Sequence, residues 1–172
     1  MPIDRPRRIY VASSWRNKQQ PAVVQALRAE GHEVYDFRKP APGRSGFAWS
    51  SIDPNWLQWA PLTFIRLLTT HHVAAEGFDY DKAALDWCDT CVLLLPSGRS
   101  AHLEAGYAAG QGKQVIALLH PDGFEPELMY LLCSGVVPSL GDLLVHLRNR
   151  RPHCEATYGW ETVQPRGVSD AD

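Results

Sequence analysis

The sequence lacks a basic excess. Its 17 lysine and arginine residues are outnumbered by 19 aspartate and glutamate residues, and the formal net charge is -2. A general polyanion binder normally carries a basic patch, so we expect no nucleic acid partner. A small phosphate ligand is compatible with this charge, because one or two local donors suffice to hold it.

Long apolar runs are also missing. The longest ones, 91–96 and 115–119, are too short to span a bilayer, and the start of the chain lacks the apolar stretch of a secretory leader. The 4 cysteines do not show the dense spacing of a disulfide framework. We therefore predict a cytoplasmic protein with no membrane partner.

Strand and helix patterns alternate along most of the chain, and no repeat or linker divides it. Buried or alternating strands are predicted at 8–12, 32–37, 90–95, 114–119 and 136–137. Helices are predicted at 19–30, 56–70, 81–88, 100–110, 126–132 and 140–150.

This alternation predicts one α/β domain over residues 1–150, followed by an irregular tail over 151–172. We expect a doubly wound, mostly parallel sheet of five strands in the flavodoxin-like order 2-1-3-4-5. Residues 38–78 are rich in tryptophan, proline and glycine and interrupt the pattern as a variable segment.

In that strand order, ligands bind where the order reverses, between the first strand and the strand at 90–95. The first strand is followed by Ser14 and Arg16, and the second by Ser97, Gly98 and Ser100. Hydroxyl groups and free N–H groups at a helix N-terminus favour a phosphate. The alternative interpretation is that Ser100 is an N-cap and that the first loop is a polar turn.

Glu104 is predicted in about the first turn of the helix at 100–110. There the helix dipole would keep its carboxylate ionised, as nucleophilic attack on an anomeric carbon requires. The alternative is a glutamate that only stabilises the helix. Ala105, Gly106, Ala108, Ala109 and Gly110 are all small. They would let this helix pack closely on the sheet or on another subunit.

Asp81 and Asp89 flank the segment before the central strand. Asp89 is predicted to stabilise the turn into that strand. Asp81 is placed near a helix N-terminus, where it would be an N-cap, or it would contact a sugar hydroxyl or protonate a leaving base.

Three weaker signals do not define a site. The Cys88-x-x-Cys91 spacing resembles half of a metal site, but no second pair exists and Cys91 lies in an apolar strand, so no metal is predicted. His71, His72 and His102 are interpreted as structural or surface residues.

Aromatic residues are dense between positions 47 and 59. Trp56 and Trp59 are expected in the core. Phe47 and Trp49 are candidates for a pocket that stacks a base.

Taken together, the motifs IYVASSWRN, the pair Asp81 and Asp89, and PSGRSAHLEAGYAAGQGKQVIAL resemble the nucleoside 2-deoxyribosyltransferase superfamily, including its 2'-deoxynucleoside 5'-phosphate N-hydrolase branch. The resemblance covers roughly residues 8–120. Residues 38–78 match poorly, and Gly98 to His102 depart from the small pair that is common there.

The resemblance implies cleavage of an N-glycosidic bond, by hydrolysis or by transfer to another base. Glu104 would be the nucleophile, Tyr10 would orient it, and Asp81 would contact the substrate or protonate the leaving base. Ser14-x-Arg16, with Ser97 or Ser100, would bind a 5'-phosphate. The resemblance also implies a nucleoside or nucleotide substrate, no cofactor, and a homodimer.

Two alternatives stay open at this point. The first is a nucleotide-binding sensor or effector module that does not turn its ligand over. The second is a TIR-like hydrolase of nicotinamide dinucleotide, which would also use a glutamate.

Overall fold

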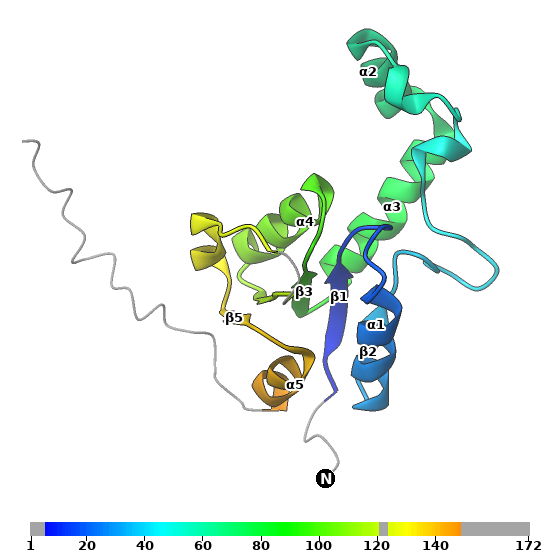
Figure 1. Ribbon diagram of the computed structural model, residues 1–172. Helices are drawn as coiled ribbons and strands as arrows, with labels where there is room; N and C mark the ends of the chain where they lie inside the picture. The colour runs from blue at the N-terminus through cyan, green and yellow to red at the C-terminus, as the bar shows by residue number, and fades with distance from the viewer. Residues whose placement is uncertain (1–5, 121–123, 149–172) are drawn as a thin grey trace, which may run out of the picture.

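The computed structural model describes residues 6–120 and 124–148, and the predicted tail lies outside these ranges. A single sheet of five parallel strands runs through the molecule in the order β2-β1-β3-β4-β5 (Figure 1). The strands are β1 (Arg8–Ala12), β2 (Glu33–Tyr35), β3 (Thr90–Leu94), β4 (Gln114–Leu118) and β5 (Gly135–Val137). The predicted fold class and strand order are therefore confirmed.

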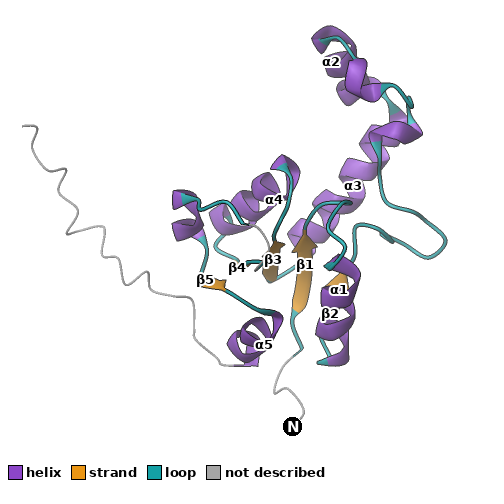
Figure 2. Ribbon diagram, in the orientation of Figure 1, coloured by secondary structure: helices purple, strands orange, loops and turns teal. Residues whose placement is uncertain are grey.

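Helices cover both faces of the sheet (Figure 2). On one face, α1 (Gln20–Ala29) and α5 (Leu140–Arg148) pack on side chains such as Ile9, Val92 and Ile116. On the other face, the end of α3 (His72–Trp87) and α4 (Arg99–Gly110) pack on Tyr10 and Cys91, among others. The alternation of side chains along β1 thus sends Tyr10 to the face covered by α3 and α4.

The segment before β3 differs from the prediction. A 3₁₀ turn, η2 (Trp56–Gln58), precedes α2 (Pro61–Thr70), because Ala60 before the proline has an extended backbone. Trp56 and Trp59 are only partly buried and lie outside the core. Further 3₁₀ turns are η1 (Trp49–Ser51) and η3 (Leu128–Leu132), where a short helix was predicted over 126–132.

Helix α3 is longer than predicted. It begins at His72 with His71 as its N-cap, whose ring Nδ1 accepts a hydrogen bond from the N–H of Val73 at 3.3 Å. Asp81 therefore lies in the middle of α3, and its prediction as an N-cap was wrong. The first half of α3 and all of α2 project away from the sheet (Figure 1). The first half of α3 does not pack on the sheet and little of it is buried, which is why the sequence did not reveal the full length of α3.

Helix α4 begins one residue earlier than predicted, with Gly98 as its N-cap and Arg99 as its first residue. Ser100 is therefore not the N-cap. Glu104 is the sixth residue of α4 and lies in its second turn. Its distance from the helix end weakens the effect of the helix dipole on its charge.

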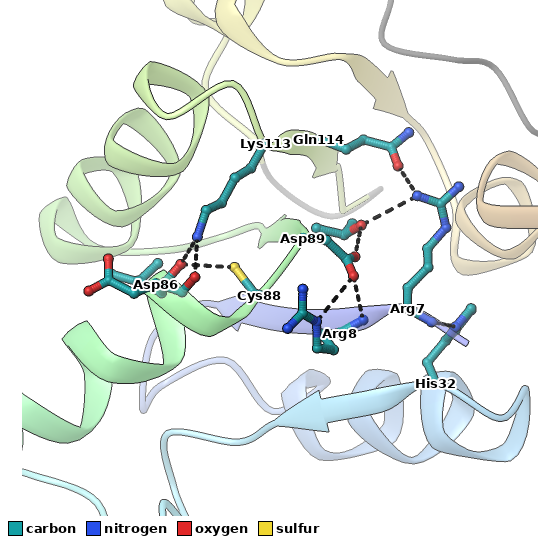
Figure 3. Close-up of polar contacts among 10 residues, drawn as sticks. Arg7, Arg8, His32, Asp86, Cys88, Asp89, Lys113 and Gln114 are labelled. Atoms are coloured by element: carbon teal, nitrogen blue, oxygen red, sulfur yellow. Dashed lines mark hydrogen bonds and ion pairs between the residues drawn. The ribbon is translucent and has the colours of Figure 1, made fainter. Parts of the chain in front are cut away.

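Asp89 has the turn role that the sequence indicated. It lies between α3 and β3, where its carboxylate accepts a hydrogen bond from the N–H of Arg8 at 3.2 Å and forms an ion pair with the Arg8 guanidinium at 3.5 Å (Figure 3). This cluster joins β1 to β3 at their amino ends, far from the carboxyl ends where ligands bind in such sheets.

Candidate active site

Two carboxylates and two tyrosines meet over β1 and β2, between α3 and α4. Tyr10 on β1 is fully buried and hydrogen-bonds Glu104 on α4. Tyr35 on β2 donates a hydrogen bond from its hydroxyl to Oδ1 of Asp81 on α3 at 2.9 Å. The two rings stack, with centroids 5.3 Å apart and an angle of 17° between their planes. The structure thus brings together the three residues predicted for catalysis and adds Tyr35.

Burial and mutual repulsion act on both carboxylates. Burial first, and then the charge of Asp81, raises the pKa of Glu104 from 4.5 to about 7, although the Tyr10 hydrogen bond favours the ionised form. Burial raises the pKa of Asp81 as well, against the hydrogen bond from Tyr35. The expectation that the helix dipole keeps Glu104 fully ionised was therefore wrong, because the cost of desolvation exceeds the help from a helix end one turn away.

The two loops predicted to meet at the switch point are in contact. The Ser13 hydroxyl donates to the carbonyl of Leu94 at 3.1 Å, and the Asn17 side-chain amide donates to the carbonyl of Pro96 at 3.1 Å. Asn17 is buried, with 4% of its surface exposed. These bonds tie the loop after β1 to the loop after β3.

Arg38 holds the loop after β1 in shape. Its guanidinium donates to the carbonyls of Trp15 and Asn17, each at 2.9 Å, and to that of Ser14 at 3.4 Å. It also lies over the Trp15 ring, 5.3 Å from the ring centre. One arginine thus holds three backbone carbonyls of the loop that carries Ser14 and Arg16.

The residues predicted to hold a phosphate lie in the loops after β1 and β3 and at the start of α4. Ser14 is partly buried and its Oγ accepts a hydrogen bond from the N–H of Arg16 at 3.2 Å, while Arg16 itself is exposed. Gly98 and Ser100 are exposed at the start of α4. Ser97 is partly buried, and its Oγ lies 3.5 Å from Nδ1 of His102.

Ser97 and His102 also line a pocket of about 310 Å³ on the side of α4 toward β4. His102 faces this pocket, where its Nε2 lies 3.1 Å from the hydroxyl of Tyr130. Glu104 is two residues further along α4 and projects to the other side of the helix. The pocket is lined by Leu95, Pro96, Ser97, His102, Phe124, Glu125, Glu127 and Tyr130, and so contains neither Glu104 nor Asp81.

The aromatic segment lies along α3 near Asp81. A Cβ atom at Gly77 would approach the Cβ of Phe47 to 2.7 Å, so Phe47 packs directly on α3 one turn before Asp81. The carbonyl of Phe47 accepts a hydrogen bond from the indole of Trp15 at 2.9 Å. The rings of Phe47 and Trp49 pack edge to face, with their centroids 4.7 Å apart. Phe47 therefore links the loop after β1 to the Asp81 end of the site.

Comparisons with known proteins give a likeness in structure. No protein-family model matches the sequence, and no curated protein matches it significantly. A 2-deoxyribosyltransferase from the psychrotolerant bacterium Bacillus psychrosaccharolyticus is 21% identical, with 78% of this chain and 88% of that chain covered, at a TM-score of 0.53. This chain has the fold of that 2-deoxyribosyltransferase. The resemblance seen in the sequence is thereby confirmed at the level of the fold.

A second solved structure, a CMP N-glycosidase from Clostridium botulinum, is 17% identical, with 83% of this chain and 99% of that chain covered, at a TM-score of 0.46. Within the described residues no helix is long and apolar enough to cross a membrane. The same residues contain no cluster of three or more histidine, cysteine or acidic side chains placed to hold a metal ion.

Sequence reasoning missed Tyr35 and Arg38. Tyr35 stands in the alternating pattern of the second strand, and its position relative to Tyr10 follows once the two strands are paired in register. Arg38 falls at the start of a segment that matches no motif, and its backbone contacts leave no signal in the sequence. Gly77 carries a signal, since a glycine inside a helix costs stability unless close packing requires it.

Proposed function

We propose that the protein cleaves the N-glycosidic bond of nucleosides or nucleoside 5'-monophosphates, with Glu104 as the nucleophile. The observation that carries the proposal is the pair of buried carboxylates, each hydrogen-bonded by its own tyrosine. Two carboxyl groups with raised pKa values are suited to sharing one proton near neutral pH. One carboxylate then attacks while the other donates the proton.

The proposed reaction has two steps. An oxygen of ionised Glu104 attacks C1', the bond from C1' to the base nitrogen breaks, and Asp81 gives its proton to the base. Water or a second base then attacks C1', the bond from Glu104 to C1' breaks, and Asp81 takes back the proton. Tyr10 keeps Glu104 oriented through both steps. The transition state resembles an oxocarbenium ion, which nearby carboxylates stabilise.

A 5'-phosphate would be bound at the N-terminus of α4 and by the loop after β1. Ser14, Arg16, Gly98 and Ser100 would supply the donors, and Arg38 would keep the first loop in shape. Ser97 would assist from the edge of the site, although Glu125 and Glu127 in the adjoining pocket do not favour an anion there. The base would lie toward Phe47 and Trp49, beside Asp81. No cofactor is needed.

The proposal is tested by incubating the purified protein with nucleosides, 2'-deoxynucleosides, their 5'-monophosphates and nicotinamide dinucleotide. Released base is followed by chromatography, with and without an added acceptor base. We expect release by the wild type and loss of release in Glu104→Gln, with Glu33→Gln, an exposed glutamate on β2, as the matched control. Acceptor-dependent formation of a new nucleoside would identify transfer.

Other outcomes favour other functions. Release of nicotinamide alone would support the TIR-like hydrolase. Tight nucleotide binding without release from any substrate would overturn the enzyme proposal and favour a sensor module. An intact-mass increase of one sugar unit on rapid quenching, absent in Glu104→Gln, would identify the covalent intermediate directly.

We also propose a homodimer through the outer face of α4. Ala105 and Ala108 pack on the sheet, but a Cβ atom at Gly106 or Gly110 would meet nothing within 4 Å, and Leu103 is 75% exposed. This small, apolar face is available to a second copy. Light scattering should show a dimer that Leu103→Arg weakens and that Leu57→Arg, on another surface, leaves intact.

A further inference from the structure

Tyr35 is placed as the counterpart of Tyr10. The two residues pair in the register of β1 and β2, and their side chains point to the same face of the sheet. Their rings stack, with the ring centroids 5.3 Å apart. Tyr10 hydrogen-bonds Glu104, and Tyr35 donates to Asp81 at 2.9 Å. Each carboxylate of the site thus has a tyrosine of its own, from an adjacent strand.

The hydrogen bond from Tyr35 goes to one defined oxygen of Asp81. A phenol can donate to Oδ1 whether the carboxyl group is ionised or protonated, because Oδ1 then acts as the carbonyl oxygen. The proton of the acid is therefore left to Oδ2. A carboxyl group held in this way has a fixed rotamer and a fixed protonated oxygen.

We propose that Tyr35 is a positioning residue, which holds Asp81 so that Oδ2 is the oxygen that exchanges a proton with the leaving base. The inference rests on the proposed function of the same site. Tyr35 acts through Asp81, since the contact that the structure records is with that carboxylate.

The surroundings of Asp81 make this hydrogen bond consequential. The ionisable groups that face the carboxylate pair are Tyr10 on β1, Tyr35 on β2 and Cys91 on β3, with Asp36 just beyond Tyr35. In the described part of the chain, no lysine or arginine is among the groups that act on either carboxylate. Loss of the Tyr35 hydroxyl should therefore raise the pKa of Asp81 and, by weakening repulsion, lower the pKa of Glu104.

Tyr35→Phe and Tyr10→Phe form a matched pair, since each removes one hydroxyl from the same stack of rings. We expect each substitution to raise the pKa of the carboxylate that loses its hydrogen bond by roughly one pH unit, and to lower the pKa of the other carboxylate. The first carboxylate is Asp81 in Tyr35→Phe and Glu104 in Tyr10→Phe. The width of the pH profile of kcat/KM should therefore change in opposite directions in the two variants. A merely structural role would shift both profiles in the same way.

The leaving base supplies a second readout. On ordinary nucleosides, Tyr35→Phe should lower kcat roughly tenfold with little change in KM, because the proton donor is misplaced. On a nucleoside of an N7-methylated purine, whose base leaves without needing a proton, this loss should disappear. The loss in Tyr10→Phe, which affects the nucleophile, should persist. In an Asp81→Asn background, Tyr35→Phe should have no further effect.

A titration of carbon-13-labelled carboxyl groups by nuclear magnetic resonance tests the pairing in the resting protein. We expect the Asp81 midpoint to rise in Tyr35→Phe and to fall in Tyr10→Phe. An unchanged Asp81 midpoint in Tyr35→Phe, or an equal rate loss on the methylated substrate, would overturn the proposal. If the wild type releases no base, the proposed function fails, whereas the titration still decides whether Tyr35 controls Asp81.

Discussion

Replacing Glu104 by glutamine should stabilise the protein at neutral pH while abolishing base release. The pKa of Glu104 is raised from 4.5 to about 7 by burial and by Asp81. The folded protein therefore binds this proton more tightly than the unfolded chain. The stability that the proton contributes is complete below pH 4.5 and is lost as the pH rises through about 7.

The size of the effect follows from the two pKa values. Their difference, 7 − 4.5, is about 2.5 and corresponds to roughly 3 kcal/mol at ~1.4 kcal/mol for each pKa unit. Glu104 is partly exposed, so solvent reduces this value, and we expect about 2 kcal/mol. For a domain of this size the gain is roughly 4 to 8 °C in Tm.

Guanidinium unfolding of the wild type and Glu104→Gln at pH 4.5 and pH 8 measures the effect. Glutamine resembles the protonated acid, so the two proteins should be equally stable at pH 4.5, and the variant should be more stable at pH 8. Glu33→Gln, at an exposed position on β2, is the control variant. A Glu104→Gln effect that does not depend on pH would refute the reasoning and favour a glutamate that only stabilises its helix.

The aromatic segment and the first loop give further predictions. Gly77→Ala should displace Phe47, because the new Cβ would lie 2.7 Å from the Phe47 Cβ, and should raise KM for base-containing substrates. Gly141→Ala on α5, where a Cβ atom would make only an ordinary contact with Ser139 Oγ at 3.7 Å, should leave KM unchanged and serves as the control. Arg38→Met should loosen the loop around Trp15. The ratio of kcat/KM on 5'-monophosphates to kcat/KM on nucleosides should therefore fall roughly tenfold. Arg38→Lys should not restore the ratio, because lysine lacks the planar guanidinium that lies over the Trp15 ring while its Nη2 donates to the loop carbonyls.

The sheet could be predicted because its signals are local. A central parallel strand is apolar throughout, as Thr90–Leu94 is, and short joints between strands and helices limit the connections. The strand order also placed the loops after β1 and β3 together, which their hydrogen bonds confirm. The first half of α3 could not be predicted, because it projects from the sheet and is not patterned by burial against it.

The site could be predicted only where one residue type suffices. Glu104 and Asp81 stand out in the sequence as carboxylates on the helices that flank the central strand. Their pKa values, however, depend on burial, and the pKa of Glu104 depends also on the charge of Asp81. The helix dipole was the wrong cause to invoke, since the start of α4 at Arg99 puts Glu104 in the second turn. Tyr35 and Arg38 depend on strand register and on backbone carbonyls, which appear only once the chain is folded.

The charges along α4 suit the proposed reaction better than they suit tight binding of a neutral nucleoside. Under the proposed function, the N-terminus of α4 would hold an anion together with Arg16, whereas Glu104 one turn later adds negative charge beside Asp81. A nucleoside 5'-phosphate lying along the helix would place its phosphate at the first position and C1' at the second. C1' gains positive charge only as the glycosidic bond breaks, so the two carboxylates stabilise the transition state more than the substrate. The desolvation that raises the pKa of Glu104 is the cost of that selectivity, which is why stability and activity should respond to Glu104→Gln in opposite directions.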